Sequence, residues 1–398
     1  MPGGGRKRGA EERGRGWSQQ RRAKWSDGEL YEKQKLWLAK KKLAVRALAL
    51  VEDAGDANGL YSANGDGTLT RFDNADGTLT NALDLGGDAR CMVASSSCLF
   101  IGLSNGAIAL QLPSAAQTAI THPSAVFALL PLPDQAVILT AGSDCTIRAW
   151  KLDDSAGRFL QVAELRGHDA SVLALACVAQ TFLVSASADG HLKAWDIPSA
   201  SCRCTVERAH AGMVGSLEVF QDHVISCGQD GTVCVWGGLA DTGELQRVYT
   251  HPTEIDNNGR PMSARCMSGV AGTNSLAVAY EGQDTHLVKL WELPSFAERG
   301  SLRSKFPLTS ITSAEGHVFT GDQESLVRVA CVGQQPPTEE NGEEQSSHKH
   351  QQHAINGDTA HAESNGGRSE RGGRGGRGGR GGRSGRRGGR GGRGGPSS

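Results

Sequence analysis

The chain has 398 residues, 38% of them hydrophobic and 21% charged, and a formal net charge of -1 at pH 7. This length suffices for one large domain or two ordinary ones with a self-sustaining core. No run approaches the length of apolar sequence that spans a membrane, so we expect no membrane segment. The ten cysteines form no CxxC pair and no apolar secretory signal is present, so we expect free thiols in a reducing compartment.

The small net charge hides a strong segregation of charge along the chain. Residues 1–46 carry 14 Lys or Arg and 5 acidic residues, whereas residues 367–398 carry 10 Arg and one acidic residue, Glu370. The residues between these segments carry 18 basic and 37 acidic side chains, a net charge of -19. The sequence therefore predicts an acidic body between two basic arms.

Residues 1–42 are predicted to be the basic N-terminal arm. Its clusters of Lys and Arg surround Trp17 and Trp25, two side chains that either stack on unpaired bases or pack on the body. The same clusters are typical of nuclear import signals.

The middle of the chain contains an internal repeat. Three segments align without gaps and are residues 139–150 (LTAGSDCTIRAW), 184–195 (VSASADGHLKAW) and 225–236 (ISCGQDGTVCVW). Each places an Asp six residues before a Trp, in the pairs Asp144 and Trp150, Asp189 and Trp195, and Asp230 and Trp236. The tryptophans are 45 and 41 residues apart, which is the period of a four-stranded propeller blade. Each segment is typical of two short strands joined by a tight turn.

Weaker copies extend the repeat in both directions. They are residues 60–72, 99–112, 276–291 and 318–329, of which only the third ends in a tryptophan, Trp291. Degenerate copies are expected in repeat arrays. With seven units, the fold predicted for residues 43–333 is an all-β, seven-bladed β-propeller.

The best unit also shows Gly167-His168 before its first strand and Trp195-Asp196 at its end, and with these it resembles the WD-repeat family. The resemblance implies a buried hydrogen-bonded chain of His168, the hydroxyl of Ser185 or Ser187, Asp189 and Trp195, which holds the blade in register. Asp144, Asp230, Trp150, Trp236 and Trp291 are assigned the same structural role in their blades. His210 and His251 stand where the family has its strand-entry histidine.

In the family, the segment before the first blade usually supplies the outer strand of the last blade. Residues 36–43 are the candidate for this strand. The local sequence favours a helix instead, because Ser26 and Glu29 form a capping box and residues 30–47 are rich in Lys, Leu and Ala. Both alternatives stay open from sequence.

The order of features from about residue 43 to 332 looks like that of plant and algal proteins that combine a CCCH zinc finger with a WD-repeat propeller. The residues that carry the resemblance are 248–251 (VYTH), 290–300 (LWELPSFAERG) and 318–322 (VFTGD). Family members place the finger before the propeller, where it is thought to contact RNA. This sequence has no Cys before Cys91, so the role of the finger is expected to be lost or to pass to the basic arms.

No pattern predicts catalysis, a cofactor or a metal site. No nucleophile or acid-base pair is signalled, so the chain is not expected to be an enzyme. Cys202 and Cys204, and the histidines of residues 348–353, lack zinc-site spacing. We therefore expect the two cysteines to be strand residues and the polar residues 334–366 to be a disordered linker.

Residues 367–398 form the C-terminal basic arm. It contains seven Arg-Gly-Gly triplets, and half of its residues are glycine, so we expect a disordered tail. Arginine pairs with phosphate and stacks on bases, which predicts RNA contact; the alternative is a solvated, solubilising tail. The candidate RNA-binding residues are Arg371, Arg374, Arg377, Arg380, Arg383, Arg386, Arg387, Arg390 and Arg393.

Together these features predict a non-enzymatic scaffold that binds protein partners through the propeller and RNA through its arms, with low sequence specificity. The alternative is a protein-only adaptor, such as a substrate receptor. We expect a monomeric propeller within a larger complex, without membrane contact, in the nucleus, including the nucleolus, or in the cytoplasm. The sequence does not indicate which face of the propeller is used.

Overall fold

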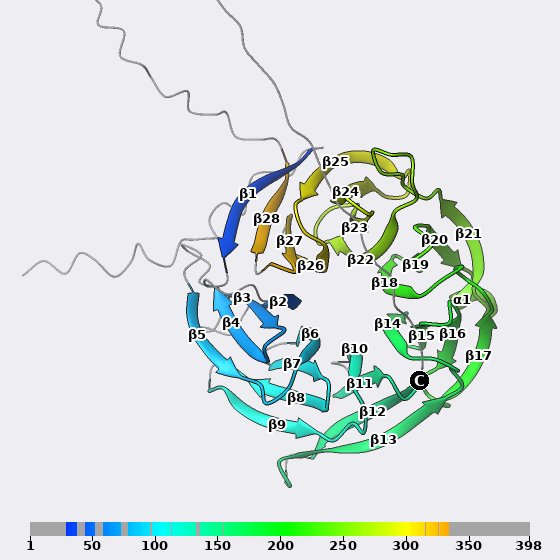
Figure 1. The fold of residues 1–398 in the computed structure, drawn as a ribbon. Coiled ribbons are helices and arrows are strands. Elements are labelled where there is room, and N and C mark those ends of the chain that lie inside the picture. The colour runs from blue at the N-terminus through cyan, green and yellow to red at the C-terminus, as the bar shows by residue number, and fades with distance from the viewer. Residues whose placement is uncertain are drawn as a thin grey trace, which may run out of the picture. The chain divides into compact units, whose positions relative to one another are not determined.

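The computed structural model describes residues 29–37, 44–51, 59–72, 79–95, 98–112, 114–132, 136–153, 155–314, 316–324 and 326–333. In these residues the chain forms seven antiparallel four-stranded sheets, arranged as the blades of a ring (Figure 1). One short helix, α1 (Leu239–Thr242), accompanies them in the described part. The predicted all-β, seven-bladed propeller is confirmed.

Each blade runs from its innermost strand at the ring axis to an outer strand at the rim. The strands of blades 1 to 4 are β2 (Val45–Val51), β3 (Gly59–Asn64), β4 (Thr68–Phe72), β5 (Leu79–Asp84); β6 (Ala89–Ser95), β7 (Cys98–Leu103), β8 (Gly106–Gln111), β9 (Ala116–Ile120); β10 (Val126–Leu132), β11 (Val137–Gly142), β12 (Thr146–Asp153), β13 (Arg158–Arg166); and β14 (Val172–Val178), β15 (Phe182–Ser187), β16 (Leu192–Asp196), β17 (Ser201–Val206). Those of blades 5 to 7 are β18 (Val214–Phe220), β19 (His223–Gly228), β20 (Val233–Gly237), β21 (Gln246–His251); β22 (Ser263–Val270), β23 (Ser275–Glu281), β24 (His286–Glu292), β25 (Ala297–Ser304); and β26 (Leu308–Ala314), β27 (His317–Asp322), β28 (Leu326–Gly333), with β1 (Glu29–Trp37).

The core lies between the blades, because both faces of each sheet are covered by neighbouring sheets. In β15, every residue from Leu183 to Ser187 is buried, which explains why its sequence is a continuous run of small and apolar residues rather than an alternating one. Trp195 of blade 4 packs in one cluster with Leu139 and Ile147 of blade 3. The repeated Trp therefore joins one blade to the next.

The ring is closed by β1, which pairs antiparallel with β28 from Glu29 opposite Gly333 to Trp37 opposite Leu326. Of the two alternatives for the segment before the first blade, the closing strand is the one that forms, but it covers Glu29–Trp37 and shares only residues 36 and 37 with the candidate segment 36–43. The helix favoured over residues 30–47 does not form in the described part, where residues 45–47 belong to β2. Pairing satisfies the backbone groups along the open edge of β28, and this tertiary gain outweighs a local helix propensity of a few tenths of a kcal/mol per residue.

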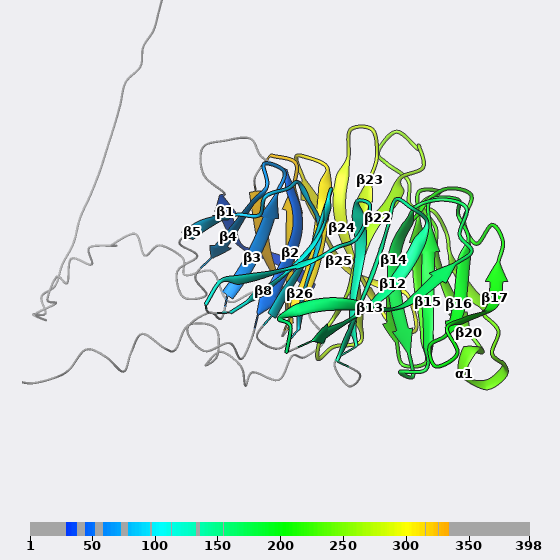
Figure 2. The same ribbon diagram turned by 90° about the horizontal axis from the view of Figure 1, so that it is seen from below.

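The ring has two faces, seen edge-on in Figure 2. The face at which the chain enters each innermost strand is called the entry face. The loops that join the second and third strands of each blade lie on this face. We call exit face the opposite one, which carries α1 and the loops between first and second strands. Because Glu29 lies opposite Gly333 at the exit-face end of blade 7, both ends of the ring lie at this face. Within the described residues, no helix has the length and apolar character needed to cross a bilayer.

Candidate functional site: the blade networks and the faces of the ring

Blade 4 contains a buried polar chain at its entry-face end. The indole Nε1 of Trp195 donates to Ser185 Oγ at 2.8 Å, and Ser185 Oγ lies 2.7 Å from Nε2 of His168. Trp195 and Ser185 are 2% and 0% exposed. The hydroxyl accepts from the indole and also shares a hydrogen bond with the imidazole, which ties the loop before β14 to β15 and β16.

The fourth expected member, Asp189, does not bond to His168. Its Oδ1 accepts the backbone N–H of His191 at 2.8 Å, while its Oδ2 and His168 Nδ1 have no hydrogen-bond partner among the described residues. Burial lowers the pKa of His168 to about 4, so the imidazole is neutral at pH 7. The other candidate hydroxyl, Ser187, donates instead to the carbonyl of Ala170 at 3.2 Å.

Blade 5 has the complete four-membered chain. Trp236 Nε1 donates to Ser226 Oγ at 2.8 Å, Ser226 Oγ lies 2.7 Å from His210 Nε2, and His210 Nδ1 lies 3.1 Å from Asp230 Oδ1. Burial acts to lower the pKa of His210, but the interactions with Asp230 and Cys234 together outweigh it and raise the pKa to about 9. Asp230 has a pKa below its usual range: burial acts to raise it, and the bonds from His210 and the Ala211 N–H reverse this. His210 therefore belongs to the network that sequence analysis assigned to Asp230 and Trp236.

Blade 3 replaces the histidine-hydroxyl link by a buried ion cluster. Trp150 Nε1 donates to Thr140 Oγ1 at 2.8 Å, whereas Nη1 of Arg148 lies 3.0 Å from His122 Nε2. Arg148, 7% exposed, also pairs with Asp144 at 2.6 Å and with Glu164 at 2.9 Å. Only Asp144 and Trp150 were expected from the sequence; Arg148 and Thr140 lie on strands of the same blade, His122 lies in the loop before β10, and Glu164 lies on the outer strand β13.

Blade 6 holds Trp291 without a strand hydroxyl. In blade 4, Ser185 lies opposite Lys193, and in blade 6, Val278 lies opposite Lys289. Val278 therefore occupies the position that Ser185 has in blade 4. Instead, the His251 ring packs 4.3 Å from the indole of Trp291, and Lys289 Nζ lies 5.0 Å from its centroid. Lys289 in turn pairs with Glu254 at 2.6 Å. Trp291 is therefore held by ring packing and by a cation over its ring, and its buried Nε1 has no hydrogen-bond partner among the described residues.

These networks are buried inside the blades and bond mainly within themselves, which makes them structural. No group of three or more His, Cys, Asp or Glu side chains is placed to hold a metal ion in the described part. Cys202 and Cys204 lie on strand β17 as free thiols, the first exposed. The histidines of residues 348–353, the basic arm before Glu29 and the Arg-Gly-Gly tail lie outside the described residues.

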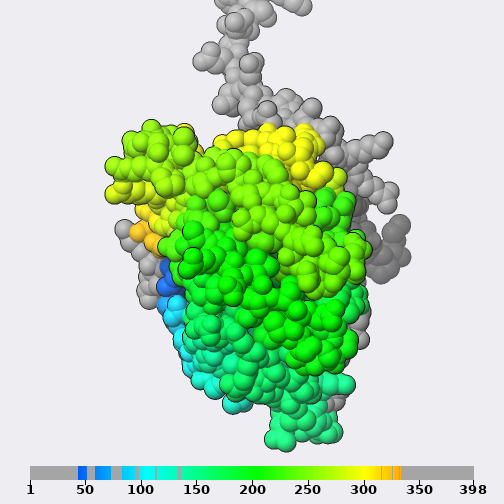
Figure 3. All heavy atoms as spheres, turned by 90° about the vertical axis from the view of Figure 1, so that its right-hand side faces the viewer, coloured from blue at the N-terminus to red at the C-terminus, as the bar shows by residue number. Residues whose placement is uncertain are grey.

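The entry face carries an exposed apolar patch at blades 5 and 6. Residues 252–262 form a loop held by the bridge between Ile255 and Pro261, and Thr253 Oγ1 donates to the Asp230 carbonyl at 3.1 Å. Asp230 lies in the turn between β19 and β20. In the same turn, the N–H of Gln229 donates to the Met213 carbonyl at 2.8 Å. Ile255 is 65% and Met213 41% exposed. We call Met213, Gln229 and Ile255 the Ile255 patch; Figure 3 shows yellow-green atoms of this part of the chain projecting from the body.

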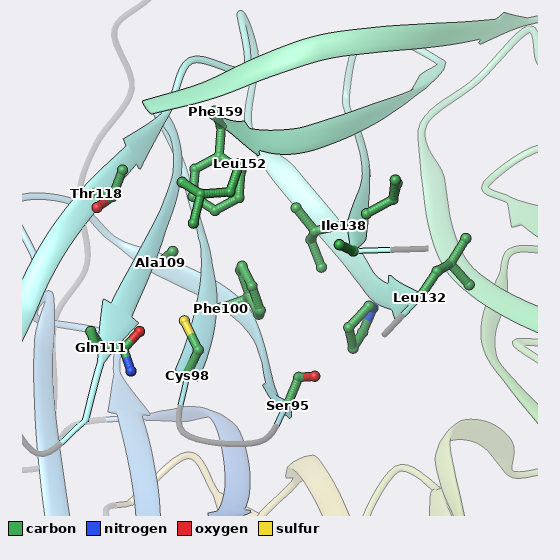
Figure 4. A pocket seen from close by; sticks show the side chains of 13 residues that line it. Ser95, Cys98, Phe100, Ala109, Gln111, Thr118, Leu132, Ile138, Leu152 and Phe159 are labelled. Carbon is green, nitrogen blue, oxygen red and sulfur yellow. The ribbon is translucent and has the colours of Figure 1, made fainter. Parts of the chain in front are cut away.

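A second apolar feature is a groove of about 400 Å³ between blades 2 and 3 (Figure 4). Its lining residues lie at or near the ends of strands that meet the exit face. We call it the blade 2–3 groove, and it is lined by Ser95, Cys98, Phe100, Ala109, Gln111, Thr118, Pro131, Leu132, Ala136, Val137, Ile138, Leu152 and Phe159.

Comparison with known proteins agrees with this architecture. The family model "WD domain, G-beta repeat" matches residues 115–151, 159–196 and 201–237, which cover most of blades 3, 4 and 5. The chain is 29% identical over 271 residues to zinc finger CCCH domain-containing protein 17 of Oryza sativa subsp. japonica, covering 68% of this chain and 60% of that protein. It is 27% identical over 274 residues to zinc finger CCCH domain-containing protein 62 of Arabidopsis thaliana, covering 68% and 63%.

A further match is telomerase protein component 1 of Mus musculus, at 25% identity over 197 residues, which covers 49% of this chain and 7% of that protein. The chain thus spans less than two thirds of the length of each of these relatives. The resemblance to plant CCCH zinc finger proteins is confirmed as a similarity across the propeller. The matched repeats and the observed sheets agree: the chain contains WD repeats and folds as a seven-bladed β-propeller.

Proposed function

We propose that this protein is a non-enzymatic scaffold whose propeller binds protein partners and whose basic arms, chiefly the Arg-Gly-Gly tail, bind RNA. The observation that carries the proposal is that the acidic propeller and the basic tail are separate segments of the chain. Residues 47–366, which hold the linker and all of the propeller except β1 and the start of β2, carry a net charge of -19, whereas residues 367–398 carry ten Arg and one acidic residue. An acidic body repels polyphosphate, so RNA affinity must come from the arms.

The chemistry of the tail favours RNA over a purely solubilising role. The arginines from Arg371 to Arg393 present planar, permanently charged groups that pair with phosphate and stack on bases, and the intervening glycines let the backbone follow an irregular strand. Such contacts read little of the base edges, so sequence specificity is low.

The protein-binding role is supported by the Ile255 patch. Ile255 and Met213 are both exposed, and their loops are bonded to the same turn at Gln229 and Asp230, so the Ile255 patch offers two large apolar side chains as anchors for a partner. The match to a telomerase component agrees with a propeller that works inside an assembly. The second candidate function is a protein-only adaptor, whose tail pairs with acidic partners; the nucleus, nucleolus and cytoplasm all suit either function.

The test is affinity purification of the full-length chain after ultraviolet crosslinking, with and without ribonuclease. RNA should crosslink to peptides of residues 367–398, and a set of proteins should persist after ribonuclease. Ile255→Glu should remove proteins from that set, whereas Val248→Glu, on β21 at 61% exposure, should not. No RNA crosslink in the tail would favour the adaptor; equal losses from both variants would exclude the Ile255 patch as the docking surface.

A further inference from the structure

The blade 2–3 groove exposes apolar surface at the exit face. Nine of its lining side chains are aliphatic or aromatic, and the rings of Phe100 and Phe159 lie edge to face at 6.2 Å. Leu152, at the end of β12, is 42% exposed at its rim. A volume of about 400 Å³ lies within the range of pockets that bury an apolar group. The groove therefore suits a large apolar side chain better than a charged one.

The nearest source of such a side chain is this chain itself. Residues 1–28 lead into β1 at Glu29, which lies at the exit-face end of blade 7. The basic arm thus joins the ring on the face to which the groove opens. In residues 1–28 the large apolar side chains are Met1, Trp17 and Trp25.

Chain length distinguishes the two tryptophans. Neighbouring sheets pack about 10 Å apart, so the groove lies at least about 20 Å from blade 7, across blades 1 and 2. Trp25 is four residues before Glu29, a reach of about 14 Å, whereas Trp17 is twelve residues before it, a reach of about 40 Å. Only Trp17 spans the gap.

The chemistry of the groove matches an indole. Burial of its ring is favourable against Phe100 and Leu152, and its N–H needs an acceptor, which the hydroxyls of Ser95 and Thr118 provide. Arg13, Arg15, Arg21 and Arg22 flank Trp17, and their charge is opposite to that of the body. A tethered segment has an effective concentration in the millimolar range, so even a weak contact is populated.

We propose that the N-terminal arm docks on its own propeller, with the Trp17 side chain in the blade 2–3 groove. Docking fixes the arm across the exit face and withdraws Trp17 from base stacking, which leaves the C-terminal tail as the main RNA contact.

The test is photo-crosslinking in the full-length protein with p-benzoylphenylalanine in place of Trp17. Irradiation should produce an intramolecular crosslink, mapped by mass spectrometry to peptides that contain the lining residues of the groove. Leu152→Glu should lower the yield by about tenfold, because a carboxylate beside the docked benzophenone ring must be desolvated. Leu160→Glu is the matched control: Leu160 is 40% exposed on the adjacent strand but does not line the groove, and its yield should equal that of the parent.

Three results would overturn the proposal. They are the absence of a crosslink to the groove, an equal loss of yield in both glutamate variants, and a crosslink that joins two chains, which would make the occupant a second copy. A crosslinker at Trp25 should not reach the groove. Melting curves of the two variants show whether each retains the fold, and RNA binding by the tail is measured separately, so failure here leaves the proposed function untouched.

Discussion

His168 and His210 occupy the same place in neighbouring blades, yet they should give opposite pH dependence of stability. His210 has an acidic partner 3.1 Å away and a pKa raised from 6.5 to about 9. His168 is buried without a bonded carboxylate, and its pKa is lowered from 6.5 to about 4. The stability that His210 contributes therefore falls when its proton is lost, whereas the stability that His168 contributes falls when a proton is gained.

For His210 the folded state binds the proton more tightly than the unfolded state, so its contribution is full below pH 6.5 and is lost as pH rises through 9. Between pH 6 and 8.5 the loss is about 2 kcal/mol. For His168 the unfolded state binds the proton more tightly, so its contribution is full above pH 6.5 and is lost as pH falls through 4. Between pH 7 and 5 that loss is also about 2 kcal/mol.

Urea unfolding of the parent, His210→Gln and His168→Gln at several pH values measures both effects. The free-energy gap between the parent and His210→Gln should shrink as pH rises, and the gap between the parent and His168→Gln should shrink as pH falls. Gaps that are independent of pH, or that change in the same direction, would refute the assignment of the two imidazoles.

Three further predictions follow from the networks and the tail. Trp195→Ala should destabilise by about 3 to 5 kcal/mol, because it empties a site that is 2% exposed; Trp195→Phe should cost less, and a melting temperature equal to that of the parent would contradict the packing. Arg148→Met should destabilise the protein by about 3 kcal/mol, because Asp144 and Glu164 lose their shared cation. Adding Glu164→Gln to this variant should recover part of the lost stability. Additive losses in a double-mutant cycle would count against the cluster. The arginines of residues 371–393 should carry methyl groups in the native cell, because Arg-Gly-Gly is a common methylation setting, and mass spectrometry that finds all of them unmodified would argue against it.

The blades were predictable because the information is local. The spacing from Asp144 to Trp150, and its copies in blades 4 and 5, encodes two strands and their turn within about a dozen residues. The count of seven followed from the period, although four copies are degenerate.

The closing strand and the blade 3 cluster were not predictable in the same way, because both depend on register between distant segments. β1 is a strand only because β28, about 300 residues away, offers an open edge. Glu164 meets Arg148 because the two are paired across β12 and β13, and a bulge between Ala149 and Trp150 shifts that register. The blade 2–3 groove uses residues of eight strands, which no single repeat encodes.

The central claim is that the tail supplies most of the RNA affinity, and its most direct test is a titration of labelled single-stranded RNA at several salt concentrations. Full-length protein is compared with a chain that ends at Gly333 and with a full-length variant in which the arginines of residues 371–393 are lysines. If five arginines each neutralise one phosphate, the slope is about 3.5 log units per tenfold change in salt, and a threefold increase in salt lowers affinity by about 50-fold.

The lysine variant should keep this slope but bind more weakly, because lysine keeps the charge and loses the planar stacking group. The shortened chain should bind weakly with a much flatter slope. Equal affinity and equal slope for full-length and shortened protein would contradict the account and leave the protein-only adaptor as the better description.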